Sequence, residues 1–311
     1  MSKADLKPLN GILLLNKSQG MTSNSALQKA KYLFGAKKAG HTGSLDPLAT
    51  GMLPVCFGEA TKISQFLLDA DKCYSTTGLL GIKTNTADSM GEVIATASSV
   101  DVSLDELQEI LTKYHGHIKQ IPSMFSALKH QGRPLYRFAR AGIEITREAR
   151  DVAISELELE RFDGQLFDLR VRCSKGTYIR NLVEDIGEDL KVGAHVTRLH
   201  RLYTAGFENN PMYTLEELLN MSAEQRLQVL IPMDKAVDYL PYHSLATEEV
   251  LALRQGRVIS GQSSYDIGTC IRLYDAEKQF IGLGEYVNQA EIRAKRLLAF
   301  ELTSQFELSE S

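Results

Sequence analysis

A glycine-rich stretch between two apolar segments constrains the fold of this chain more than any other feature. Residues 35–51 contain four glycines and one proline, a composition that predicts a loop and excludes a regular helix or strand. The flanking segments, residues 11–16 (GILLLN) and residues 52–57, are continuously apolar and predict buried strands. Long loops inside compact domains are usually functional, so we expect the chemistry of the protein here.

The composition is that of an ordinary soluble globular protein. With 43% hydrophobic and 24% charged residues in 311, the chain suits one large domain with an appendage or two medium domains. No apolar run reaches the roughly 18–20 residues that span a bilayer, and the start does not resemble a secretory signal, so we expect a cytoplasmic protein. The four cysteines are far apart and form no CxxC pair, which favours reduced thiols over a metal site or disulfides.

Apolar periodicity predicts alternating helices and strands in the first three quarters of the chain. Ser103 and Glu106 have the spacing of a capping box and predict a helix that ends near Tyr114. The other predicted helices are 22–34, begun by Thr22 or Ser23, then 59–68, 177–190, 215–219 and 223–230. The other predicted strands are 74–82, 152–161 and 165–173.

The pattern changes after Leu240-Pro241, which we interpret as a linker. A short helix at 247–254 is followed by predicted strands at 258–259, 269–274, 280–286 and 296–301. We therefore expect one domain over residues 1–243 and a small β-rich domain over residues 244–311.

The charge of the chain is unevenly distributed. A net charge of −4 argues weakly against a nucleic-acid partner, because binding to phosphates requires Lys and Arg side chains. Residues 125–150, however, contain six basic side chains against the two acidic ones, Glu144 and Glu148. The six are Lys129, Arg133, Arg137, Arg140, Arg147 and Arg150. We interpret this segment as a basic surface loop or mobile arm that contacts a nucleic acid.

Within the glycine-rich loop, His41 and Asp46 are the candidate reactive groups. A metal site would require several ligands at close spacing, and a phosphate loop would require GxxxxGK[ST]; neither pattern is present. An aspartate before proline also commonly begins a structural turn. From these residues alone, Asp46 is either a turn residue or a reactive carboxylate.

Two distant segments offer partners for such a carboxylate. Tyr74 opens a predicted strand, where its ring could stack on an unpaired base or could equally belong to the core. Arg180 lies at the start of a predicted helix, where it could pair with a carboxylate through two hydrogen bonds or remain a solvated cation.

Six segments, taken together and in order, resemble the TruB family of tRNA pseudouridine synthases. They are LNKSQGMTSN (15–24), GHTGSLDPLATGMLPVCFGEATK (40–62), KCYSTTGLLGIKTNTADSMGEV (72–93), IPSMFSALKHQGRPLYRFARAG (121–142), SKGTYIRNLVEDIG (174–187) and GAHVTRLHRL (193–202). The resemblance extends over about residues 9 to 305. Ser18 departs from the family pattern, which commonly has proline there, and this affects the stiffness of a turn.

The resemblance implies the fold and the reaction. It implies a mixed α/β (α+β) catalytic domain around a largely antiparallel sheet, followed by a small PUA-type RNA-binding domain. The implied substrate is uridine 55 in the T-loop of tRNA, converted to pseudouridine without cofactor or metal. We expect a stand-alone bacterial enzyme, a monomer that binds the tRNA T-arm and needs neither a membrane nor an obligate protein partner. Three alternatives stay open: a non-catalytic tRNA-binding or folding protein, a guide-RNA-dependent synthase and, as a distant third, a metal-dependent hydrolase that a chelator would inhibit.

The resemblance also implies roles for individual residues. Asp46 matches the catalytic aspartate, Tyr74 the residue that stacks on the target base, and Arg180 the partner of the aspartate. His41, Tyr178 and Leu199 match positions that line the nucleotide site, and Lys62 and Asp88 match supporting polar positions. In the basic arm, Lys129, Arg133, Arg137 and Arg140 are the expected contacts to the RNA backbone.

Overall fold

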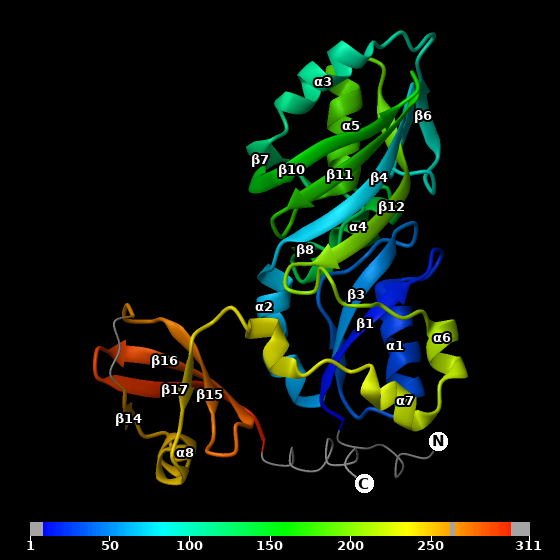
Figure 1. Ribbon diagram of the computed structural model, residues 1–311. Coiled ribbons are helices and arrows are strands. Elements are labelled where there is room, and N and C mark those ends of the chain that lie inside the picture. Colours follow the sequence, from blue (N-terminus) through cyan, green and yellow to red (C-terminus); the bar gives the residue numbers. More distant parts are fainter. Residues whose placement is uncertain (1–8, 262–264, 300–311) are drawn as a thin grey trace.

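The computed structural model describes residues 9–261 and 265–299, and its main feature is a large, mostly antiparallel sheet (Figure 1). This sheet has eight strands in the order β1-β3-β12-β4-β11-β10-β7, with β2 paired to β3. The strands are β1 (Gly11–Lys17), β2 (Ala39–His41), β3 (Thr50–Phe57), β4 (Lys72–Leu80), β7 (Gly116–Gln120), β10 (Arg150–Phe162), β11 (Leu166–Cys173) and β12 (Ala194–Thr204). Only β12 and β3 pair in parallel, so the predicted largely antiparallel α/β fold is confirmed.

Helices cover this sheet (Figure 1), and apolar side chains of the helices and of the strands pack together in the main core. They are α1 (Ser23–Leu33), α2 (Ser64–Asp69), α3 (Leu104–Thr112), α4 (Leu135–Arg140), α5 (Ile179–Asp189), α6 (Leu215–Asn220) and α7 (Ala223–Gln228), with the 3₁₀ helices η2 (Gly58–Lys62) and η3 (Met233–Val237). α5 packs on β12 and α3 packs on α5, while α1 packs on β2, β3 and α6. The starts of α1 and α5 both lie beside the glycine-rich loop, since Ser23 bonds to Leu45 and Arg180 pairs with Asp46.

Helix caps follow the sequence signals. Thr22 caps α1 by accepting a hydrogen bond from Ser25 N, and Gly35 follows the helix with φ of 61°. Ser103 and Glu106 form the predicted capping box of α3. Of the two candidate caps for α1, Thr22 has this role, which leaves the hydroxyl of Ser23 available for another contact.

A second sheet begins at β13 and has its own apolar core (Figure 1). Its order is β13-β15-β16-β17-β14, with β13 (Tyr242–Ser244), β14 (Ile259–Ser260), β15 (Cys270–Tyr274), β16 (Phe280–Asn288), β17 (Glu291–Leu297) and helix α8 (Thr247–Arg254). Hydrogen bonds link it to the first part of the chain: Tyr274 Oη donates to Asp234, and Lys62 Nζ donates to Leu297 O. The predicted small C-terminal β-rich unit is confirmed.

The structure corrects several sequence predictions in the first part of the chain. The loop of residues 35–51 contains the short strand β2, and the helix predicted at 59–68 is divided at Ile63 into η2 and α2. The strand predicted at 74–82 ends at Leu80, because Gly81 turns the chain with φ of 88° into the hairpin of β5 (Ile82–Thr84) and β6 (Val93–Thr96).

Further corrections concern the arm, β12 and β17. The arm is not simply a loop, since it contains the hairpin β8 (Lys129–His130) and β9 (Arg133–Pro134) and then α4. β12 was not predicted, although it lies inside the sheet between β3 and β4. β17 ends at Leu297, so the strand predicted at 296–301 began too late, and its last two residues lie outside the described residues. Within the described chain, no helix is long and apolar enough to cross a membrane.

Candidate active site

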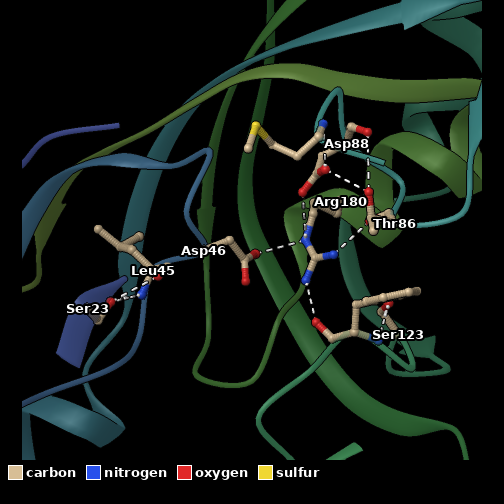
Figure 2. A network of polar contacts seen from close by, with 9 residues as sticks. Ser23, Leu45, Asp46, Thr86, Asp88, Ser123 and Arg180 are labelled. Carbon is tan, nitrogen blue, oxygen red and sulfur yellow. Dashed lines mark hydrogen bonds and ion pairs between the residues drawn. The ribbon is translucent and has the colours of Figure 1, made fainter. Parts of the chain in front are cut away.

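The glycine-rich loop is held by side chains from α1 and β12. Ser23 Oγ accepts a hydrogen bond from Leu45 N at 2.7 Å and donates to Leu45 O at 2.9 Å (Figure 2). From β12, the guanidinium of Arg201 donates to Gly43 O at 3.0 Å and to Met52 O at 2.5 Å, and this side chain is only 1% exposed. The loop is therefore bound at several points and presents Asp46 in a defined position.

Gly51 closes the loop and permits no side chain. Its φ is 98°, and a Cβ atom would lie 2.2 Å from Arg201 O and 2.8 Å from Arg201 N. Both contacts are with backbone atoms of β12, which cannot move aside without breaking the pairing of β12 with β3. The glycine is thus required where the loop joins the sheet.

Asp46 and Arg180 form an ion pair in this site. The Nε atom of Arg180 lies 2.8 Å from Asp46 Oδ2, and Figure 2 shows the carboxylate directed at the guanidinium. Arg180 is 3% exposed, whereas the side chain of Asp46 is 39% exposed, so one face of the carboxylate is open to a substrate. This contact is an ion pair rather than a regular hydrogen bond, because Nε forms no hydrogen bond of regular geometry among the described residues. The attraction is therefore mainly electrostatic and leaves the oxygen lone pairs available.

Arg180 also connects two further segments to the site. Its Nη1 donates to Thr86 O at 2.7 Å and its Nη2 donates to Phe125 O at 2.9 Å. The buried carboxylate of Asp88 lies 3.9 Å from Arg180 Nε and accepts hydrogen bonds from Thr86 Oγ1 and Met90 N (Figure 2). Because these contacts determine the orientation of the guanidinium, Asp46 faces a cation that cannot turn away.

The pKa of Asp46 lies above its ordinary value. Burial raises this pKa more than the positive charge of Arg180 lowers it, and the nearby charge of Asp88 raises it further. The sequence predicted the lowering effect of Arg180 but not the larger effect of burial. The open face of the carboxylate keeps it in contact with solvent, so Asp46 can ionise.

Several buried cations near the loop were missed by the sequence analysis, and Lys17 and Arg201 are two of them. Lys17, at the end of β1, is 1% exposed and donates to Ser18 O at 2.9 Å and to Met21 O at 2.7 Å. Burial lowers the pKa of Lys17 to about 8, and its charge favours the ionised form of Asp46. Arg201 is the other cation. From the sequence alone both residues read as surface charges, because Lys and Arg are almost never fully buried unless paired.

Tyr74 and His41 are both partly buried beside this loop. Tyr74 lies on β4 and packs against the main apolar cluster, and burial raises the pKa of its hydroxyl. His41 lies on β2, where burial lowers its pKa, and its Nδ1 is buried without a hydrogen-bond partner among the described residues. The negative charge of Asp46 also raises the pKa of the Tyr74 hydroxyl, so the two side chains are close enough to interact electrostatically.

Comparison with known proteins identifies the family. A model described as TruB family pseudouridylate synthase (N terminal domain) matches residues 31–179, and models of the tRNA pseudouridylate synthase B C-terminal domain and of the Pseudouridine synthase II TruB C-terminal region match residues 180–238 and 241–298. A curated protein of Legionella pneumophila (strain Lens), named tRNA pseudouridine synthase B, is 66% identical over 94% of this chain and 97% of its own length. The chain belongs to the TruB family.

More distant members of the family and a solved structure also match nearly the whole length of this chain. Proteins of the same name from Tolumonas auensis and Vibrio cholerae are 49% and 46% identical, each over 94% of this chain and over 93% and 96% of their own lengths. A solved structure described as a Cbf5-Nop10-Gar1 complex matches with a TM-score of 0.71 and 25% identity, over 92% of this chain and 84% of that one. The TruB-family fold therefore includes both sheets of the chain.

The other residues that matched the TruB family have distinct positions. Tyr178 occupies the position before the first residue of α5, and its backbone makes two hydrogen bonds with the buried side chain of Gln120, at 3.0 and 3.2 Å. Leu199 lies on β12 and is 6% exposed within the main core. Lys62 donates to Leu297 O and pairs with Glu59 at 2.6 Å, so its ammonium group contacts the C-terminal sheet. The structure does not bring Lys62 into the network around Asp46.

The basic arm of this TruB-family chain presents its cations to solvent. Lys129, Arg133, Arg137 and Arg140 are all exposed, on the β8–β9 hairpin and on α4. The base of the arm is bonded to α5, because Asn181 Nδ2 donates to Ile121 O at 3.0 Å and Arg180 donates to Phe125 O. The arm and the Asp46–Arg180 pair are therefore joined through the first turn of α5.

No metal site accompanies this arrangement in the described part of the chain. No group of three or more His, Cys, Asp or Glu side chains there could hold a metal ion. A cavity of about 930 Å³ lies between the base of the arm and the acidic face of α5, and Asp46 does not line it. The candidate site is the open face of Asp46, not this cavity.

Proposed function

We propose that this chain is a tRNA pseudouridine synthase that converts uridine 55 of the T-loop to pseudouridine, with Asp46 as the reacting group. The observation that carries the proposal is the ion pair of the half-open carboxylate of Asp46 with the buried Arg180, 2.8 Å apart, in a chain of the TruB family. The identity of 66% to a protein named tRNA pseudouridine synthase B supports tRNA as the substrate.

The reaction requires that the base leave its stack. The bond between uracil N1 and ribose C1′ breaks, the base turns, and C5 joins C1′; one proton leaves C5 and one is gained at N1. A uracil in a folded T-loop cannot turn in place, so it must be flipped into a pocket at a cost of a few kcal/mol. We assign Tyr74 as the ring that stacks on the flipped base, and His41, Tyr178 and Leu199 as residues that line the nucleotide site.

Asp46 acts in its ionised form, and Arg180 holds that form in place. The carboxylate attacks ribose C1′ or base C6, or removes a ribose proton to give a glycal; each route requires the carboxylate to be open to the nucleotide, and the side chain of Asp46 is 39% exposed. The carboxylate of Asp88 helps to hold the guanidinium of Arg180 electrostatically, since it lies 3.9 Å from Nε. The exposed Lys129, Arg133, Arg137 and Arg140 bind the phosphates of the T-arm, which orients the RNA without reading its sequence.

The test is the release of tritium from uridine labelled at C5 in transcribed tRNA, because only isomerisation displaces that hydrogen. We expect release by the wild type, none by Asp46→Asn, and wild-type release by the control Asp101→Asn, which removes an exposed carboxylate. Binding of tRNA by Asp46→Asn should remain near that of the wild type. Tritium release by Asp46→Asn would contradict the role of Asp46.

The same assay separates the alternatives. Absence of release by the wild type would favour a non-catalytic tRNA-binding or folding protein. Release that depends on added guide RNA and protein partners would favour a guide-dependent synthase, whereas activity of the purified monomer on a T-arm hairpin supports the stand-alone enzyme. A tRNA with cytidine at position 55 should release no tritium if the proposed position is correct.

A further inference from the structure

The hydroxyl of Ser23 makes two hydrogen bonds to the residue that precedes Asp46. It accepts from Leu45 N at 2.7 Å and donates to Leu45 O at 2.9 Å, and the side chain is 4% exposed (Figure 2). A serine hydroxyl has one donor and two acceptor sites, so these two bonds use its only proton. The hydroxyl thus holds both peptide groups of Leu45, including the one that leads into Asp46.

The chain on the other side of Asp46 is held separately. Gly20 N donates to Pro47 O at 2.8 Å, and Ala49 N donates to Asp46 O at 3.1 Å, which closes a turn after the aspartate. Before the aspartate, Ser23 is the side chain that bonds to the peptide entering Asp46, while Arg201 bonds two residues further back, at Gly43. The direction of the Asp46 side chain therefore depends on Ser23.

Ser23 is not needed to begin its own helix. Thr22 caps α1 by accepting from Ser25 N at 3.1 Å, and Ser23 is the first residue of the helix. The two neighbouring hydroxyls thus have different tasks, one for the helix and one for the loop 22 residues away along the chain. This division offers a matched pair of substitutions at adjacent positions.

We propose that Ser23 is a positioning residue that sets the direction of the Asp46 carboxylate toward the reacting nucleotide and toward Arg180. The inference rests on the proposed role of Asp46 as the reacting group. Without the hydroxyl, the N–H and C=O of Leu45 lose their partners in a buried place, and the loop shifts to find others. Small displacements of a reacting group are expensive, since a shift of about 1 Å can cost about 100-fold in rate.

The experiment compares Ser23→Ala with Thr22→Ala in single-turnover tritium release at saturating tRNA. We expect Ser23→Ala to lower the rate constant by about 10- to 100-fold with tRNA affinity within about twofold of wild type, whereas Thr22→Ala destabilises α1 but keeps the rate. Ser23→Cys retains the size of the side chain with a much weaker donor and acceptor, so its rate should fall as well.

A second measurement distinguishes positioning from general destabilisation. If the carboxylate of Asp46 turns away from Arg180, the acid limb of the rate profile in Ser23→Ala should move to higher pH, because the cation lowers the pKa of Asp46. Thermal melts of all variants give the folded fraction, by which each rate is corrected.

The inference is overturned if the corrected rate constants of Ser23→Ala and Ser23→Cys equal that of Thr22→Ala, or if only tRNA affinity changes. Asp46→Asn distinguishes this failure from failure of the proposed function. An inactive Asp46→Asn with a fully active Ser23→Ala refutes the positioning role alone, whereas an active Asp46→Asn refutes the role of Asp46.

Discussion

Replacement of Asp185 by Asn should stabilise the folded protein at neutral pH. Asp185 lies on α5 in a row of four carboxylates with Glu184, Glu188 and Asp189. Lys83 pairs with Glu188 and Lys113 with Asp189, but within the described residues no ion pair is formed by Asp185. Burial and the repulsion of its three acidic neighbours raise the pKa of Asp185 from 3.8 to about 6.

The size of the effect follows from this shift. A rise of about two pKa units means that ionisation of Asp185 lowers the free energy of unfolding by about 3 kcal/mol, at about 1.36 kcal/mol per unit. Because the side chain is only partly buried, solvent screening reduces the figure, and we expect a gain of about 1–2 kcal/mol for Asp185→Asn at about pH 7.5. Asn has about the same helix propensity as Asp, so the helix itself is little affected.

The stability gained by Asp185→Asn should depend on pH in one direction only, increasing as pH rises. The folded state holds the Asp185 proton more tightly than the unfolded state, so the contribution of Asp185 to stability falls as pH rises from about 4 to about 6 and is then constant. Asn cannot ionise, so the gain should be near zero at about pH 3, roughly half of its full value at about pH 5, and complete above about pH 7.

Urea unfolding followed by circular dichroism measures the gain, with Asp101→Asn as a control for loss of an exposed carboxylate. The control should change stability by less than about 0.5 kcal/mol. A gain that is equal at about pH 5 and about pH 7.5 would refute the reasoning. So would a lower stability of Asp185→Asn at neutral pH.

The remaining predictions concern the site, the loop and the arm. Lysine in place of Arg180 cannot keep both carbonyl hydrogen bonds and the ion pair, so for Arg180→Lys urea unfolding should show a free energy of unfolding lower by about 1.5–3 kcal/mol, and tritium release should slow. Unchanged stability would contradict the assigned contacts of the guanidinium. Gly51→Ala should cost more than about 1 kcal/mol in the same unfolding measurement, because its Cβ meets the backbone of β12; a neutral effect would contradict the close approach. The single-turnover rate should fall at low pH with a midpoint above about pH 3.9, since the pKa of Asp46 is raised. A midpoint below that pH would mean that the charge of Arg180, and not burial, has the larger effect on this pKa. The double variant Arg137→Ala, Arg140→Ala should weaken tRNA binding in filter assays, and the difference should shrink as salt increases; a salt-independent difference would exclude phosphate contacts.

Elements with strong local signals were predictable from the sequence. The apolar run of β1, the capping box of α3 and the amphipathic pattern of α5 depend on short-range physics, and each appears within about two residues of its expected place. The pairing of Asp46 with Arg180 was also anticipated, and the structure gives 2.8 Å between them.

Features that depend on tertiary context were not predictable. β12 carries basic side chains at His195, Arg198, His200 and Arg201, which conceal a strand buried between two others. The full burial of Arg201 depends on carbonyl groups of the loop, which are brought near only by folding. The upward shift of the Asp46 pKa has the same origin, because burial cannot be read from a glycine-rich segment.

The contacts that build the site join parts of the chain that are far apart in sequence. Arg180 bonds to Thr86 and Phe125 across 94 and 55 residues, and Arg201 bonds to Gly43 across 158 residues. Such contacts form late in folding, because the entropy of closing long loops must be overcome first. A nascent chain that ends before β12 contains the glycine-rich loop but not Arg201, whose side chain holds it. We therefore expect the site around Asp46 to be complete only when synthesis has passed β12 and the large sheet has formed.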